Sequence, residues 1–156
     1  MVAKGELGRD RGKKRKALLD VGAKERARNF RATRDARRTE VIEDYVEMVA
    51  DLIDTKGEAR TVDIADRLGV SHATVVKAVA RIKVMGLVTN RPYRGIFLTE
   101  RGRAMANASR SRHEVVLAFL RAIGVREETA QRDAEGMEHH CSPETLAAFV
   151  RVIRGR

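Results

Sequence analysis

The residues best suited to chemistry lie near the carboxyl end of the chain, in the segment Glu135-Gly-Met-Glu-His-His140. A helix turns by about 100° per residue, so Glu135, Glu138 and His139 would lie on one side of it, whereas His140 would point away. Two carboxylates and an imidazole, with no thiolate, are typical ligands of manganese, iron(II) or zinc. Three ligands seldom complete a site for a hard cation, so the segment predicts a metal site that needs further donors.

Two other segments supply candidate donors. Asp44 and Glu47 would share one helix face, and His113 lies in another long helical segment. The candidate metal ligands are Asp44, Glu47, His113, Glu135, Glu138 and His139. Four carboxylates and two imidazoles suffice for one six-coordinate ion or for two divalent ions with bridging carboxylates. The alternatives are a solvated acidic helix face, a packed or solvated histidine, and a polar run on a surface helix.

The positive charge is concentrated at the amino terminus. The chain has 156 residues and a net charge of +10. Residues 1–38 contain 14 Lys and Arg against 5 Asp and Glu, giving +9, whereas residues 39–156 sum to +1. The first segment has few large apolar residues to bury, so we expect residues 1–38 to be a mostly disordered basic tail. This tail either adds phosphate contacts to nucleic acid or only aids solubility.

The composition also bears on the compartment. The longest apolar run, Val115–Leu120, is far shorter than the ~20 residues that cross a bilayer, and no apolar block follows the basic amino terminus. The one cysteine, Cys141, cannot form an intrachain disulfide, which agrees with a reducing compartment. We expect a soluble cytoplasmic protein without a membrane partner.

From Thr39 onward, apolar residues recur mostly at helical spacing. Thr39, Ser71, Thr99 and Ser142 are predicted to cap helices. Residues 87–98 predict two short strands around a turn that contains Pro92 and Gly95. The predicted helices span about residues 39–56, 61–68, 72–85, 100–123, 127–140 and 143–153.

Helix, short helix, tight turn, longer helix and basic hairpin form the order of a winged helix-turn-helix. The predicted fold is mainly α: a winged helix-turn-helix DNA-binding domain with a small β-hairpin over 39–103, and an α-helical metal-binding and dimerisation domain over 104–156. The third helix would enter a major groove of double-stranded DNA, and the hairpin would meet the backbone. The predicted DNA-binding residues are Ser71, His72, Thr74, Lys77, Arg81, Arg91, Tyr93 and Arg94. A solvated helix face is the alternative for any one of them.

The carboxy-terminal half is small for an independent core. About fifty residues with several apolar helix faces make a marginal core that association would complete, so we expect a homodimer. Two recognition helices would meet successive major grooves ~34 Å apart, which requires a palindromic operator. Because the candidate ligands come from both halves, bound metal would tie the DNA-binding half to the dimer core.

Five segments together resemble a known family. They are Ile42–Glu47, Val62–Val75, Tyr93–Thr99, Arg112–Glu114 and Asp133–His140. Over about residues 40–150 they resemble the diphtheria toxin repressor family of metal-dependent transcriptional repressors. The resemblance implies the same six ligands that spacing suggests. It also implies the manganese branch, because iron-responsive members have Met at the position of Asp44 and Cys at that of Glu135.

The resemblance implies a homodimeric repressor that is not an enzyme and acts on no small-molecule substrate. It would hold one or two Mn²⁺ per subunit, bind DNA when manganese is abundant and turn off manganese uptake genes. The alternatives are an iron(II)- or zinc-responsive repressor of the same fold, a dinuclear metallohydrolase, and a metal-independent nucleoid binder that relies on the basic tail.

Overall fold

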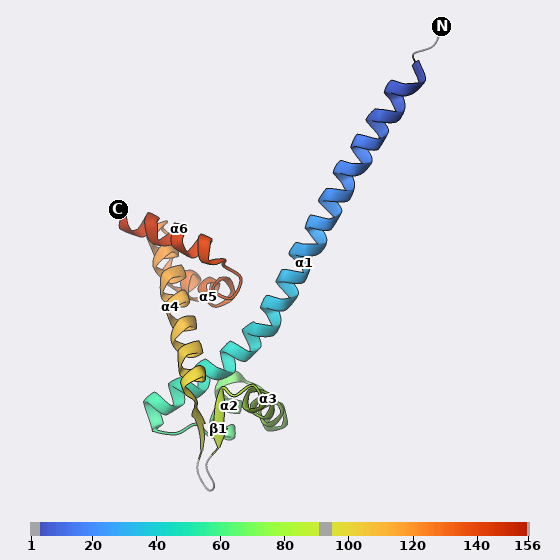
Figure 1. Ribbon diagram of the computed structural model, residues 1–156. Coiled ribbons are helices and arrows are strands. Elements are labelled where there is room, and N and C mark those ends of the chain that lie inside the picture. The colour runs from blue at the N-terminus through green and yellow to red at the C-terminus, as the bar shows by residue number, and fades with distance from the viewer. Residues whose placement is uncertain (1–3, 91–94, 156) are drawn as a thin grey trace. The chain divides into compact units, whose positions relative to one another are not determined.

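The computed structural model describes residues 4–90 and 95–155, with side chains from Gly22 onward. These residues form helices and one two-stranded antiparallel sheet (Figure 1). The elements are α1 (Lys4–Lys56), α2 (Thr61–Leu68), α3 (His72–Val84), β1 (Val88–Asn90), β2 (Ile96–Leu98), α4 (Glu100–Ala122), α5 (Glu127–Met137) and α6 (Pro143–Arg154). The chain divides into two compact units, Met1–Ala36 and Arg37–Arg156. No helix in the described ranges is long and apolar enough to cross a membrane.

Residues 4–38, which the sequence predicts to be part of a mostly disordered tail, are helical in the structure. Helix α1 begins at Lys4 and passes through Thr39, which therefore caps no helix. Between residues 22 and 39 nearly all side chains are exposed, so burial does not hold this part of the helix. The segment is rich in Arg, Lys and Ala, which are strong helix formers. A helix already nucleated by packing further along the chain can extend at little cost.

The first hydrophobic core lies in the unit Arg37–Arg156 and joins α1, α2, α3, the hairpin and the start of α4. Val46, Val49 and Leu52 of α1 follow helical spacing and are completely buried. They pack with Ile64 of α2 and Val75 of α3, which are also completely buried. This core holds the two helices of the helix-turn-helix against α1.

Local sequence signals set the ends of these helices. Gly69 adopts the left-handed conformation, with φ 64°, and ends α2. The Ser71 side chain accepts a hydrogen bond from the Thr74 backbone N–H at 3.2 Å, and Thr99 accepts one from Gly102 at 3.1 Å. Both predicted caps are therefore confirmed.

The hairpin and α4 meet at a close backbone contact. Strands β1 and β2 pair as a hairpin, as the sequence predicts, and their register is Val88↔Leu98, Thr89↔Phe97 and Asn90↔Ile96. A Cβ atom added to Gly102 in α4 would lie 2.0 Å from the carbonyl oxygen of Leu87. Glycine at position 102 therefore allows α4 to leave the hairpin directly.

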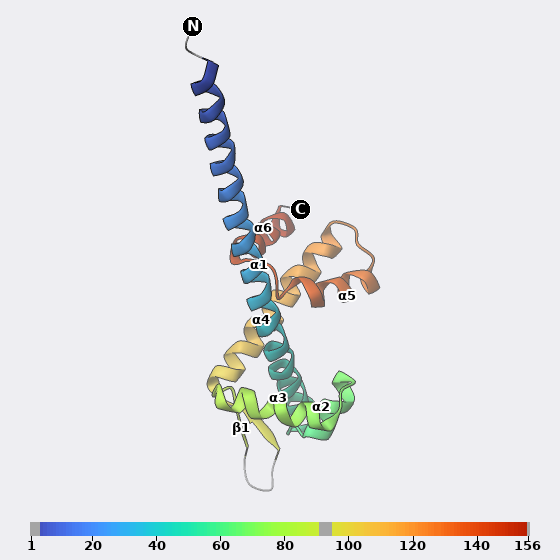
Figure 2. The ribbon, with the colours of Figure 1, turned by 90° about the vertical axis from the view of Figure 1, so that its right-hand side faces the viewer.

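Helices α4, α5 and α6 lie together in both views (Figures 1 and 2), and a second hydrophobic core lies between them. Val116 of α4 and Ala134 of α5 are completely buried, and the rings of Phe119 and Phe149 stack with centroids 3.9 Å apart. No residue of α6 is fully buried within the chain. The apolar side chains of α6 thus remain partly open in a single subunit.

Helix α5 ends at Met137 and not at His140, where the sequence predicted its end. The N–H of His140 bonds to the carbonyl of Met137 at 3.0 Å, so the last turn tightens after Glu138. Glu135 and Glu138 still share a helical face. His139 lies beyond the helix, and α-helical spacing no longer determines its direction.

Candidate metal centre and DNA interface

Five of the six predicted metal ligands lie around one cavity of about 460 Å³ within the unit Arg37–Arg156. Its predicted ligands are Asp44, Glu47, Glu135, Glu138 and His139. The first two come from α1, and the others from α5 and the turn that follows it. The fold therefore brings together residues that are about ninety positions apart in sequence.

The sixth predicted ligand, His113 of α4, contacts the same group. Its Nδ1 lies 2.5 Å from Oε2 of Glu138 and 3.7 Å from Oε1 of Glu135. Glu138 is buried, with 2% of its surface exposed, whereas the Glu135 side chain is largely exposed. His113 and Glu138 thus form the inner part of the cluster, with Glu135 at its edge.

The imidazole of His139 is buried between carboxylates on both of its sides. Nε2 lies 3.4 Å from Oδ1 of Asp44 and 3.5 Å from Oε1 of Glu138, and Nδ1 lies 2.7 Å from Oε2 of Glu43. Hydrogen bonds to Asp44 and Glu43 raise the pKa of His139 to about 10. The imidazolium therefore supplies positive charge to a site whose other donors are mostly acids.

Burial disfavours the ionised form of two carboxylates of the site. Burial raises the pKa of Glu138 to about 7, and it also raises the pKa of Glu47, against a hydrogen bond from Ser109. Oε1 of Glu47 is buried and has no hydrogen-bond partner. A buried carboxylate oxygen without a partner is costly, and a cation would satisfy it.

The side chains of the cluster mostly bond to one another. Within residues 4–90 and 95–155, no three His, Cys, Asp or Glu side chains are arranged to hold a metal ion as they stand. The donor types, the shared cavity and the orphaned oxygen of Glu47 nevertheless fit a hard divalent cation. Metal binding would replace contacts such as His113–Glu138 with bonds to the ion.

Sequence reasoning missed Glu43, which contacts both His139 and Arg112. The Nη2 of Arg112 lies 2.7 Å from Oε2 of Glu43, and these contacts hold the pKa of the Glu43 carboxyl low against the effect of its burial. Glu43 precedes Glu47 by four residues and therefore shares its helix face. That spacing was the available signal.

A second ionic cluster fixes α1 against α4. Arg110 of α4 bonds to Asp51 and lies 3.1 Å from Oδ2 of Asp54, and Arg103 lies 3.8 Å from Oδ1 of Asp54. These side chains are about half exposed, so each pair contributes little to stability. Because these ion pairs join α1 to α4, they orient the segment of α1 that carries Asp44.

Helix α3 presents the predicted recognition residues on its exposed side. Ser71, His72, Thr74, Lys77 and Arg81 are all exposed. The Ser71 side chain caps the helix, and Nε2 of His72 lies 2.8 Å from Oγ1 of Thr61 in α2. Lys77 and Arg81 lie one helical turn apart and give this face its positive charge. The predicted hairpin contacts Arg91, Tyr93 and Arg94 lie outside the described residues.

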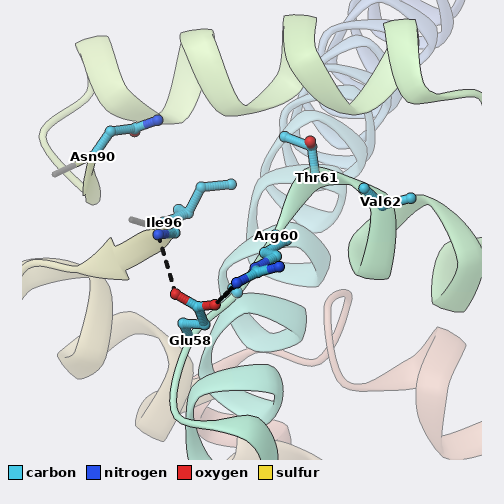
Figure 3. Close-up of a pocket in the computed structure, with 8 residues that line it drawn as sticks. Glu58, Arg60, Thr61, Val62, Asn90 and Ile96 are labelled. Carbon is cyan, nitrogen blue, oxygen red and sulfur yellow. Dashed lines mark hydrogen bonds and ion pairs between the residues drawn. The ribbon is translucent and has the colours of Figure 1, made fainter. Parts of the chain in front are cut away.

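A separate cavity of about 490 Å³ lies at the base of the hairpin and the start of α2 (Figure 3). Glu58 spans it, accepting a hydrogen bond from Nε of Arg60 at 2.7 Å and one from the Gly95 backbone N–H at 3.4 Å. Among the described residues that line it there is no histidine and one carboxylate, so it does not resemble the acidic cavity between α1 and α5. Glu58 instead ties the hairpin to the loop before α2.

Comparison with known proteins assigns the chain to a family. The family model described as "Iron dependent repressor, N-terminal DNA binding domain" matches residues 38–96, and "Iron dependent repressor, metal binding and dimerisation domain" matches residues 99–154. "Transcriptional regulator MntR" of Escherichia coli O157:H7 is 54% identical over 83% of this chain and 83% of its own length. The chain belongs to the iron-dependent repressor family.

Other members of this family agree with the assignment. "HTH-type transcriptional regulator MntR" of Bacillus subtilis (strain 168) is 41% identical over 67% of this chain and 73% of its own length. A solved structure titled "Manganese-dependent transcriptional repressor complex with manganese" is 26% identical and has a TM-score of 0.63. The match covers 71% of this chain and 51% of the solved chain, so this chain spans about half of that protein's length.

The two halves of the iron-dependent repressor family divide the candidate ligands. Asp44 and Glu47 lie in the residues matched by the DNA-binding half, and His113, Glu135, Glu138 and His139 lie in those matched by the metal-binding and dimerisation half. The resemblance noted in the sequence is therefore confirmed at the level of the family. Its members compared above are transcriptional regulators.

Proposed function

We propose that the chain is a manganese-activated transcriptional repressor that binds a palindromic operator as a homodimer and has no enzymatic activity. The observation that carries the proposal is the gathering of Asp44, Glu47, Glu135, Glu138 and His139 around one cavity. The DNA-binding half supplies two of these donors, and the metal-binding half supplies the rest. Binding of metal and binding of DNA are thereby linked through α1.

The donor chemistry supports manganese. Carboxylates and imidazoles without a thiolate suit Mn²⁺, and relatives include a repressor whose solved structure is titled as manganese-dependent. We propose that Asp44, Glu47, His113, Glu135, Glu138 and His139 hold one or two Mn²⁺ per subunit. Iron(II) or zinc is the alternative, because affinity order alone does not favour manganese.

Charge explains how the site would control DNA binding. Asp44, Glu47, Glu135 and Glu138 approach one another in a partly buried site and repel when ionised. A bound cation would supply the positive charge that offsets this repulsion and bonds that join α1 to the turn after α5. The proposed consequence is that the DNA-binding domain, residues 39–103, is held in one orientation on the domain of residues 104–156.

The proposed DNA contacts lie on α3 and the hairpin. Lys77 and Arg81 would meet bases and phosphates of a major groove, with Ser71, His72 and Thr74 beside them, and Arg91, Tyr93 and Arg94 would meet the backbone. The apolar side chains of α6 are only partly buried, and Val152 in α6 and Ile123 just after α4 are exposed, which supports association of two subunits. Genes for manganese uptake are the proposed targets.

The test begins with selection of a binding site from a random duplex library in the presence of Mn²⁺. Fluorescence anisotropy of the labelled site then compares Mn²⁺, Fe²⁺ under anaerobic conditions, Zn²⁺ and chelator. We expect tight binding with Mn²⁺ and weak binding with chelator. Equal affinity in Mn²⁺ and chelator would refute metal activation, and activation by Fe²⁺ or Zn²⁺ alone would replace manganese as the effector.

A further inference from the structure

We propose that Glu43 is a positioning residue that directs the Nε2 atom of His139 into the metal cavity. This inference rests on the proposed metal-binding function. The cavity is lined by Asp44 and Glu47, but their neighbour Glu43 is not part of the lining. Glu43 is buried behind the imidazole of His139, on the side away from the other candidate ligands.

The contacts of His139 distinguish its two ring nitrogens. Nδ1 lies 2.7 Å from Oε2 of Glu43, whereas Nε2 lies 3.4 Å from Asp44 and 3.5 Å from Glu138. An ionised carboxylate only accepts hydrogen bonds, so Nδ1 carries the proton in this contact. Nδ1 is then closed to a metal, and Nε2 is the nitrogen that binds one when the metal displaces its proton.

Arg112 holds the Glu43 carboxylate in this place from the opposite side. Its Nη2 lies 2.7 Å from the same oxygen that faces His139 and donates to Oγ of Ser109 at 3.0 Å. Ser109 is completely buried and the Arg112 side chain is mostly buried, so the guanidinium has little freedom. Two donors on one carboxylate oxygen also offset the cost of burying it.

The pair therefore connects three elements behind the candidate ligands. Arg112 belongs to α4, Glu43 to α1 and His139 to the turn after α5. Without Glu43, the ring of His139 could turn about its side-chain bonds and present either nitrogen. A hydrogen-bonding partner behind a histidine ligand typically accounts for 10–100-fold in metal affinity.

The test measures Mn²⁺ binding and the hydrogen on Nδ1 separately. Free Mn²⁺ is quantified by electron paramagnetic resonance during titration of the full chain, its Glu43→Ala variant and its Glu40→Ala variant. Glu40 lies on α1 beside the same cavity, so its removal controls for the loss of one negative charge. We expect Glu43→Ala to weaken binding about 10–100-fold and Glu40→Ala to change it much less.

Long-range ¹H–¹⁵N spectra of the Zn²⁺-loaded, ¹⁵N-histidine-labelled protein report the ring nitrogens, with His139→Gln used for assignment. We expect the His139 Nδ1–H signal in the unsubstituted chain and in Glu40→Ala, and its loss in Glu43→Ala. Glu43→Gln keeps the size and one acceptor oxygen, and we expect it to keep this signal with an affinity between those of Glu43→Ala and the unsubstituted chain. If Glu43→Ala does not fold, Glu43→Gln provides the comparison with the unsubstituted chain.

The results separate this inference from the proposed function. If the unsubstituted chain binds no Mn²⁺, the metal-binding proposal itself fails. If it binds Mn²⁺ and Glu43→Ala binds equally well, or if the assigned metal-bound nitrogen of His139 is Nδ1, the positioning role of Glu43 is wrong. Affinities of Glu43→Gln and Glu43→Ala that are equally low would also count against it.

Discussion

Nδ1 of His113 lies 2.5 Å from Oε2 of Glu138, and this contact joins the middle of α4 to the end of α5. The other oxygen of Glu138 lies 3.5 Å from Nε2 of His139. One buried carboxylate thus lies between both candidate histidine ligands. Its burial raises the pKa to about 7, so its ionised form is stabilised chiefly by positive charge nearby.

Replacing Glu138 with glutamine should abolish most of the metal response. Glu138→Gln keeps the shape but removes the charge that a divalent ion needs. We expect Mn²⁺ affinity, measured by calorimetric titration, to fall by more than the ~10–100-fold typical of residues behind the ligands. Activation of DNA binding by Mn²⁺ should fall in parallel.

The matched control is Glu144→Gln, which removes the same charge from the exposed start of α6. Its Mn²⁺ affinity should equal that of the unsubstituted chain. If Glu138→Gln binds Mn²⁺ as tightly as the unsubstituted chain does, Glu138 is not a metal ligand.

Addition of Mn²⁺ should stabilise the folded chain. A ligand that binds only the folded state adds about 2.7 kcal/mol at a free concentration one hundred times its Kd. Differential scanning calorimetry should therefore show a higher Tm in Mn²⁺ than in chelator, and the difference should vanish in Glu138→Gln. A Tm that is the same with Mn²⁺ and with chelator would contradict a metal site in the folded protein.

Lys77 on α3 should contribute a phosphate contact. We expect Lys77→Ala to weaken binding to the selected DNA site and to lower the slope of log K against log salt by about 1. Lys83→Ala is the control, because Lys83 is exposed on the same helix but six residues away and turned to another side. If both variants give the same slope as the unsubstituted chain, α3 does not meet DNA through Lys77.

Two glycines should respond in opposite ways to alanine. In Gly102→Ala, the new Cβ would lie 2.0 Å from the Leu87 carbonyl oxygen, so the hairpin or α4 must shift, which typically costs about 1–3 kcal/mol. In Gly136→Ala, the Cβ meets nothing within 4 Å in α5, so helix propensity should stabilise by roughly 0.5–1 kcal/mol. Urea unfolding in chelator checks both signs, and a neutral Gly102→Ala would show that α4 can move away from the hairpin.

The caps and the apolar spacing predicted most of the fold of residues 39–156. Ser71, Thr99 and Ser142 cap α3, α4 and α6 as the sequence indicates, because each lies just before a helical apolar pattern. The sequence could not predict α1 before Thr39. Between residues 22 and 38 that part of the helix buries almost no side chain. Apolar periodicity, on which the prediction of helices mainly rested, is lacking in the sequence before Thr39.

The candidate site was predicted by donor types more than by geometry. Glu135 and Glu138 keep helical spacing, but His139 lies beyond α5, and only its burial against α1 aims its ring. Glu43 was missed because its role depends on Arg112, which is distant in sequence and adjacent only after folding. The spacing of Glu43 from Glu47 indicates only that the two share a helix face, and it carries no information about the contact with Arg112.

Helix α4 is unbroken from Glu100 to Ala122. Ala106 of α4 belongs to the first core and Val116 to the second. The stretch of helix from Ala106 to Val116, about 15 Å long, sets both the distance between the two cores and the direction in which each faces. One residue inserted between Ala106 and His113 would turn the rest of α4 by about 100° and carry His113 away from Asp44. Any insertion in this segment of α4 would therefore change the distance or the direction in which the two cores face each other.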